Sequence, residues 1–159
     1  MAEPPGLRER KKAATKAALS QATLRLSLEK GGLDAVTADD IAAAAGVSTR
    51  TFHNYFQSKE AALLHDLREM NVRAVESLRR RARSQPVWDA LRDACIDVGA
   101  EANADLELLQ CKEQLIRASP ALISHQASQF LEFFNEALGV VAEATGTDEH
   151  DMHPRLLLG

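Results

Sequence analysis

The residues best suited to chemistry lie in one short stretch, residues 48–56, and they are hydrogen-bonding groups at helical spacing. Arg50 and Asn54 are four residues apart, so at about 100° per residue they share one face of a helix. Arginine can bond bidentately to guanine, and asparagine to adenine, in the major groove of DNA. Phe52 and Phe56 have the same spacing on the opposite face. The pattern predicts a short helix that packs through its phenylalanines and presents donors and acceptors to base edges.

A second short helix must hold this one in place. It begins at Thr37 with Asp40 three residues on, a capping-box-like start with Asp in place of the usual Glu or Gln. Gly46 can take the positive φ of a sharp turn, and Ser48 is a natural N-cap for the following helix. Helices this short are not stable alone, so they must pack on a longer helix expected over residues 8–30. The segment is therefore predicted to be a helix-turn-helix, whose second helix enters the major groove.

The rest of the chain also has helical periodicity, with no convincing strand-like alternation. We expect a long helix from Ser58 to the arginines at 79–81, one beginning at Pro86, two over residues 105–118 and 121–144, and the opening of an eighth near residues 148–154. The predicted fold class is all-α. The predicted domains are a three-helix helix-turn-helix head with a basic N-terminal arm, residues 1–60, and a helical ligand-binding and dimerisation body, residues 61–159.

Charge is unevenly distributed along the chain. The net charge of −4 taken alone argues against a nucleic-acid binder. Residues 1–80, however, carry 13 Lys and Arg against 10 Asp and Glu, whereas residues 81–159 carry 6 against 13. The densest basic block lies between Leu7 and Lys16, and its cations are Arg8, Arg10, Lys11, Lys12 and Lys16. We predict that this block is an arm that binds phosphates and is disordered without DNA, with a solvated tail as the alternative.

Bulk composition is that of an ordinary globular protein, with 45% hydrophobic and 26% charged residues. No apolar run approaches the roughly 20 residues of a membrane span, and the first six residues lack the apolar core of a signal peptide. The two cysteines, Cys95 and Cys111, fit a reducing compartment. We therefore expect a cytoplasmic protein without a membrane partner.

The stretch from Val36 to Leu64 resembles the DNA-binding signature of the TetR family of transcriptional regulators. The matching positions are Thr37, Ile41-Ala42, Ala45-Gly46-Val47-Ser48, Phe52, Tyr55-Phe56 and Ser58-Lys59-Glu60. The preceding residues 8–15, RERKKAAT, are similar to the basic arms of many members. The signature covers about residues 8–66, and beyond it only the number and spacing of helices fit.

The resemblance implies a DNA-binding role for particular residues. Thr37 and Lys59 are expected to bond phosphates, with a solvated lysine as the alternative for Lys59. The Tyr55 hydroxyl is expected at the DNA backbone, with a half-buried packing ring as the alternative. The recognition positions, together with the cap at Ser48, are Thr49, Arg50, Thr51, His53 and Asn54; a solvated surface residue is the alternative for His53.

The resemblance also implies a body that senses a small molecule. In the family, the helices after the head form a ligand pocket, and ligand binding changes the spacing of two DNA-binding heads. This implies a repressor that binds a palindromic operator as a homodimer and is released by an effector of unknown identity. The candidate pocket residues are the apolar Met70, Trp88, Leu109, Phe130, Phe133 and Phe134 and the polar Gln110, Cys111, Glu113 and His125. Core packing is the alternative for each.

Other chemistry has little support. The sequence contains no P-loop, GxGxxG, GxSxG or HExxH motif, so we expect neither an enzyme nor a cofactor. His150 and His153 are three residues apart but have no further ligand pattern, so no metal site is predicted. The rival function is a helical protein-interaction module without specific DNA binding, which would show no salt-dependent DNA affinity.

The family usually continues for two further long helices that form its dimer. This sequence stops within the uncapped run Leu156–Gly159. We therefore expect a truncated chain that is monomeric or aggregation-prone on its own.

Overall fold

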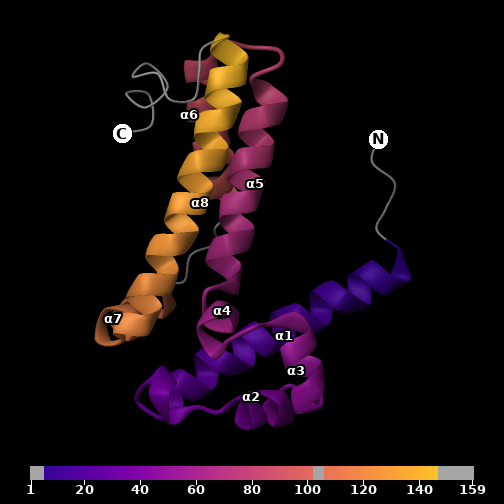
Figure 1. Cartoon of the computed structure of the whole chain (residues 1–159), viewed down its shortest axis with the longest axis vertical. Coiled ribbons are helices and arrows are strands. Elements are labelled where there is room, and N and C mark those ends of the chain that lie inside the picture. Colours follow the sequence, from indigo (N-terminus) through magenta and orange to yellow (C-terminus); the bar gives the residue numbers. More distant parts are fainter. Residues whose placement is uncertain (1–5, 102–105, 147–159) are drawn as a thin grey trace. The chain divides into compact units, whose positions relative to one another are not determined.

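The computed structural model describes residues 6–101 and 106–146, and every regular element within those ranges is helical (Figure 1). The elements are α1 (Leu7–Glu29), the short 3-10 helix η1 (Leu33–Ala35), α2 (Ala38–Ala44), α3 (Thr49–Tyr55), α4 (Lys59–Leu63), α5 (His65–Arg81), α6 (Val87–Glu101), α7 (Leu106–Ala118) and α8 (Pro120–Thr145). The predicted all-α fold is confirmed. The expected eighth helix near residues 148–154 lies outside the described residues. None of the described helices is long and apolar enough to cross a membrane.

The chain packs into two compact units. The head unit comprises Met1–Asp66 and Leu106–His125, and so contains α1 to α4, α7 and the start of α8. The bundle unit comprises Leu67–Asp105 and Gln126–Gly159, with most of α5, α6 and the rest of α8. The functional division at residue 60 stays a prediction. Packing divides the chain differently, because residues 106–125 join the head unit.

The first core of the head unit holds the two short helices against α1. Leu19 and Ala22 of α1, Ile41 and Ala42 of α2, and Phe52 and Phe56 around α3 form one buried cluster. Phe52 is only 1% exposed, as the inward-facing position predicts. Small side chains on α1 and α2 allow the close approach that two seven-residue helices need, since neither could be stable alone.

Caps fix the ends of these helices. Thr37 Oγ1 accepts a hydrogen bond from the Asp40 amide at 3.1 Å, and the Asp40 carboxylate accepts one from the Thr37 amide at 3.0 Å. The predicted capping box is therefore present. A hydrogen bond from Lys30 Nζ at 2.8 Å is the largest cause lowering the pKa of Asp40 from 3.8 to about 2. Gly46 makes the turn into α3 with φ of 68°, a value that favours glycine.

The prediction of one long helix from Ser58 to the arginines at 79–81 was wrong. The helix is interrupted at Leu64, which has φ of −93° and ψ of 10° and separates α4 from α5. Leu63, Leu64 and His65 are all buried. Leu63 and Leu64 pack in a cluster with Ile116 and Leu122, whereas the ring of His65 lies against that of Phe56, with centroids 5.3 Å apart. Neither glycine nor proline marks this break in the sequence.

A second core in the head unit attaches α7. Leu33, Leu63 and Leu64 pack with Ile116 of α7 and Leu122 of α8 in a buried cluster. On α7, the side chain of Lys112 is 16% exposed and its Nζ lies 3.9 Å from a carboxylate oxygen of Asp66. Burial lowers the pKa of Lys112, and the negative charge of Asp66 opposes that shift.

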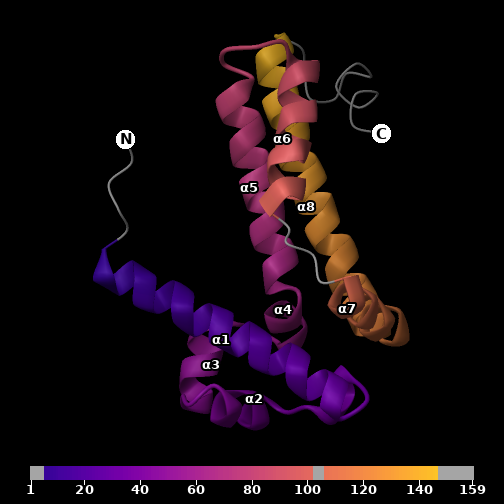
Figure 2. The same ribbon diagram turned by 180° about the vertical axis from the view of Figure 1, so that it is seen from behind.

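The bundle unit is built from longer helices. Figures 1 and 2 show α5, α6 and α8 side by side along much of their length. Their core contains Val75 and Leu78 of α5, Ala90 and Ala94 of α6, and Val141 of α8. Pro86 lies immediately before α6, and its carbonyl accepts the first intrahelical bond from the Ala90 amide at 3.0 Å. Pro86 is therefore the N-cap residue. It was predicted from the sequence as the first residue of the helix.

A polar network ties α5 to α6 near the end of the bundle. Arg81 donates to both oxygens of the Asp97 carboxylate, each at 2.8 Å from Nη2. Ser77 donates to the same carboxylate at 2.7 Å, and Arg81 Nη1 lies 3.6 Å from Asp93. These partners lower the pKa of Asp97, Ser77 most and Arg81 next.

Candidate nucleic-acid interface

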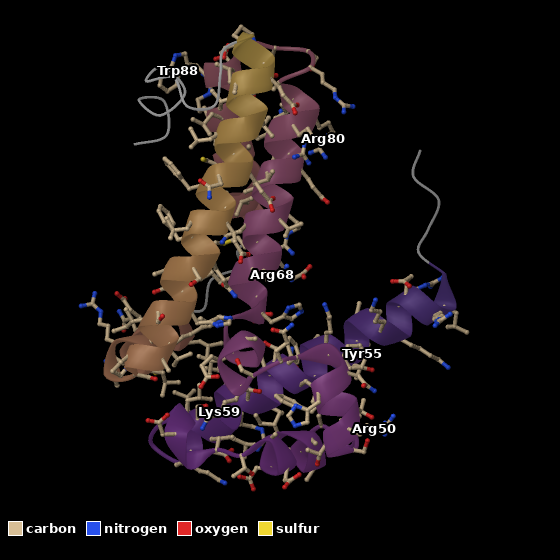
Figure 3. All side chains as sticks on the ribbon, in the orientation of Figure 1. Arg50, Tyr55, Lys59, Arg68, Arg80 and Trp88 are labelled. Atoms are coloured by element: carbon tan, nitrogen blue, oxygen red, sulfur yellow. The ribbon has the colours of Figure 1, made fainter. Side chains whose placement is uncertain are left out.

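Helix α3 is positioned so that one face is buried and the other is free. Ser48 caps it, since its Oγ accepts the Thr51 amide at 3.1 Å. The buried Phe52 anchors the inner face. Arg50, His53 and Asn54 are exposed, and Arg50 lies on the outer side of the helix in Figure 3.

Two of these side chains keep their full hydrogen-bonding capacity. Within residues 6–101 and 106–146, neither Arg50 nor Asn54 forms a hydrogen bond or ion pair. His53 packs its ring edge-on to Phe52, with ring centroids 5.3 Å apart, and remains exposed. An exposed arginine and asparagine on one short helix are the donors and acceptors that read guanine and adenine edges.

A groove joins α3 to the N-terminal end of α1. Its volume is about 810 Å³, and it is lined by Leu7, Arg8, Glu9, Lys11, Lys12 and Thr15 of α1 and by Thr51, Asn54 and Tyr55 of α3. Three cations and a single carboxylate therefore face the polar side of α3. Such a groove can bind phosphate along one wall while the other wall reaches base edges.

The expectation of a disordered arm was wrong for the residues that the structure describes. Arg8 to Lys16 form the first turns of α1, which begins at Leu7. Arg8, Lys11, Lys12 and Thr15 follow the i, i+3, i+4, i+7 spacing of one helix face. The helix expected over residues 8–30 already included these basic residues and is confirmed, so only the expectation of disorder fails.

Three hydroxyls predicted at the DNA have partners within the head unit. Thr49 Oγ1 donates to the carboxylate of Asp39 on α2. The hydroxyls of Ser48 and Thr51 lie 2.8 Å apart and bond to each other. These bonds position α3, while the Thr51 methyl group keeps its ability to contact a thymine methyl.

The residues predicted to contact phosphates differ in how many of their hydrogen-bonding groups are already used inside the head. Lys59 Nζ donates to the carbonyls of Leu33 at 2.9 Å and Val36 at 3.1 Å, so two of its three protons are used inside the head. The Thr37 hydroxyl accepts a bond in the capping box and can still donate its own proton to a phosphate. Tyr55 packs on the first core and also lines the groove. It is thus a half-buried packing ring at the place where a contact with the DNA backbone was expected. Phosphate contact by each stays a prediction.

The candidate ligand-pocket residues are divided between the two units. Leu109, Gln110, Cys111, Glu113 and His125 belong to the head unit, and Met70, Trp88, Phe130, Phe133 and Phe134 to the bundle unit. Trp88 and Phe130 are 58% and 57% exposed. Among the ten, Phe133 lines a cleft in the described bundle, together with residues that the sequence did not single out. Their role in ligand binding stays a prediction.

The described residues contain no group of three or more His, Cys, Asp or Glu side chains placed to hold a metal ion. His150 and His153 lie outside those residues. The arrangement in the head is that of a helix-turn-helix DNA-binding protein.

Comparison with known proteins agrees with this class. Residues 19–65 match the family "Bacterial regulatory proteins, tetR family", and residues 85–159 match the MftR C-terminal domain. The chain is similar to the HTH-type transcriptional regulator TcmR of Streptomyces glaucescens, with 27% identity over 161 residues, covering 97% of this chain and 71% of that protein. The chain belongs to the TetR family and is a DNA-binding transcriptional regulator.

Proposed function

We propose that the protein is a transcriptional repressor that binds a palindromic operator as a homodimer and is released by a small-molecule effector. The observation that carries this proposal is the groove in which α3 and the basic face of α1 meet. It supplies both kinds of contact that specific DNA binding requires, namely phosphate neutralisation and base-edge hydrogen bonds. The protein would act by binding and not by catalysis, in the cytoplasm where its operator lies.

Within the groove, Arg8, Lys11 and Lys12 would neutralise phosphates. Arg50 and Asn54 would read bases, because their polar groups have no partner elsewhere in the described residues. A single head can make few such contacts, so two heads about 34–36 Å apart would be needed to engage a palindrome. Exposed apolar residues of the bundle unit, including Ile96 and Leu131, are available for pairing with a second copy.

The experiment that tests DNA binding is a fluorescence-anisotropy titration of labelled duplex at several salt concentrations. We expect the logarithm of affinity to fall linearly with the logarithm of salt, with a slope of about −0.9 for each phosphate contacted. Replacing Lys11 and Lys12 with Gln should flatten that slope by up to about 2, whereas the same change at Lys112 of α7 should leave it unaltered. No salt dependence in the unmodified protein would favour the protein-interaction module instead.

Release by an effector requires a separate measurement. A preformed complex with selected operator is titrated with candidate small molecules, and dissociation is followed by anisotropy. Light scattering of the same samples gives the oligomeric state. Binding of a single copy to an intact palindrome, whatever the oligomeric state of the free protein, would contradict the proposed dimer.

A further inference from the structure

A small polar cleft lies between α5 and α8 within the bundle unit. Its volume is about 30 Å³, enough for a single small polar group. Helix α5 contributes Arg68, Asn71 and Val72, and Figure 3 marks the place of Arg68 on that helix. Helix α8 contributes Gln129, Glu132, Phe133 and Glu136, which follow the spacing of one helix face.

One residue of the cleft lining, Gln129, carries an acceptor without a partner. Gln129 is 6% exposed, and its Oε1 is buried without a hydrogen-bond partner. Among the described residues it is the one buried side-chain oxygen or nitrogen in that condition. Burying an acceptor without a donor is costly, and in native proteins such a group calls for an explanation. A ligand with an N–H group would explain it, because that group could donate a hydrogen bond to Oε1.

The charges of the lining indicate which kind of donor. Glu132, Glu136 and Arg68 are exposed at the cleft, and none of them forms an ion pair within the described residues. The lining therefore combines two carboxylates and the Gln129 amide with one guanidinium. An acceptor-rich cleft of this size suits an ammonium group, for which the Phe133 ring can also provide a favourable face.

An apolar surface adjoins the cleft. Phe133 belongs to an aromatic cluster in which the rings of Phe130 and Phe133 lie 6.4 Å apart, and those of Phe130 and Phe134 stack at 6.2 Å. Phe130 is largely exposed. A ligand whose head occupies the cleft can therefore lay an apolar tail across this cluster.

We propose that the α5–α8 cleft binds the head group of an amphiphilic organic cation, with Gln129 Oε1 as its buried acceptor and Glu132 and Glu136 as its counter-charges. This inference rests on the proposed effector response, since it gives the effector's chemical class. The site itself can be tested without DNA.

The first experiment measures binding of three probes with the same tail to the whole chain by isothermal titration calorimetry. The probes are hexylammonium chloride, 1-hexanol and sodium hexanoate. We expect hexylammonium to bind at least about tenfold more tightly than either control, because it alone brings a charged donor. Equal binding of all three would overturn the proposal.

The second experiment uses substitutions with opposite expected signs. Glu132→Gln should weaken hexylammonium binding, and Arg68→Gln should tighten it because a like charge is removed. The matched controls are Glu143→Gln on α8 and Arg79→Gln on α5, both exposed and outside the lining. Loss of binding with both test variants would indicate a structural role and contradict the proposal.

The buried acceptor has its own test. Gln129→Met keeps the length of the side chain and removes the oxygen, so hexylammonium should bind about tenfold more weakly. The unliganded variant should unfold at the same temperature or higher, since no satisfied bond is lost. A lower unfolding temperature together with unchanged binding would mean that Oε1 is satisfied by a water only.

Anisotropy with labelled operator on the same samples separates the two proposals. If hexylammonium binds but does not release DNA, the site stands and the effector response fails. If DNA binds and hexylammonium does not, the inference about the cleft fails while DNA binding stands.

Discussion

Different kinds of polar contact stabilise the inside of the head unit and the inside of the bundle unit. In the head, hydroxyl caps at Thr37, Ser48 and Ser58 bond to amides three residues on. In the bundle, Arg81 of α5 pairs with Asp97 of α6, 16 residues further along the chain. Short helices need caps because most of their backbone groups are terminal, whereas helices of 15 to 26 residues depend mainly on their packed faces. The head should therefore be sensitive to local changes and the bundle to changes at its tertiary pairs.

The largest expected effect is on the head. Phe52→Ala removes a fully buried ring and should cost about 3–5 kcal/mol of head stability. Tyr55, the one tyrosine, reports on the head by near-UV circular dichroism, and Trp88, the one tryptophan, reports on the bundle by fluorescence. We expect the Tyr55 transition to shift far more than the Trp88 transition.

Phe130→Ala is the matched control, because Phe130 is mostly exposed. It should change stability by about 1 kcal/mol or less. Equal shifts of the Tyr55 and Trp88 transitions in Phe52→Ala would show that the two units unfold as one. The contrast between a locally stabilised head and a bundle stabilised by tertiary pairs would then be wrong.

The next effect concerns DNA recognition by the head. Arg50→Ala should cost about 1–3 kcal/mol of binding and relax base preference at one operator position. Lys12→Ala should weaken binding to all sequences alike and reduce the salt slope by about 1. Competition assays with single-base operator variants measure both. If both substitutions relaxed sequence preference, the assignment of phosphate contacts to α1 and of base contacts to α3 would be wrong.

A smaller effect is expected in the bundle. Arg81→Ala leaves the Asp97 and Asp93 carboxylates without their guanidinium partner and should cost about 1–2 kcal/mol, since the pair is partly solvated. The loss should be seen in the Trp88 transition. Arg79→Ala, on an exposed position of the same helix, is the control and should have little effect. A shift confined to Tyr55 would contradict the assignment of this network to the bundle.

The smallest effect is on acid stability. The pKa of Asp40 is lowered to about 2, so the stability it contributes is fully present above the unfolded value near 4 and is lost as the pH falls towards 2. Asp40→Asn should remove this part of the pH dependence from the Tyr55 transition between about pH 4 and 2. Asp97→Asn should do the same for Trp88, since the pKa of Asp97 is also lowered. Chemical denaturation at several pH values measures both.

The same contrast explains what the sequence could predict. The capping box at Thr37, the turn at Gly46 and the inward Phe52 were all predicted, because each depends on neighbours within a few residues. The break at Leu64 was not, since it results from packing against Ile116 and Leu122, far along the chain. Gln129 carried no signal for the same reason: its burial and lack of a partner depend on how α5 meets α8.

The attachment of α7 to the head also has a consequence for synthesis of the protein. The leucines at 33, 63 and 64 are covered by Ile116 and Leu122, so the amino-terminal helices cannot complete their packing when they first leave the ribosome. Until residue 122 has been translated, an apolar surface of the nascent DNA-binding region stays open to water, a condition that favours chaperone binding or aggregation. A fragment ending at residue 66 would keep that surface permanently. The folding unit of the head is thus longer than its DNA-binding motif, and its last part arrives after most of the bundle's first two helices.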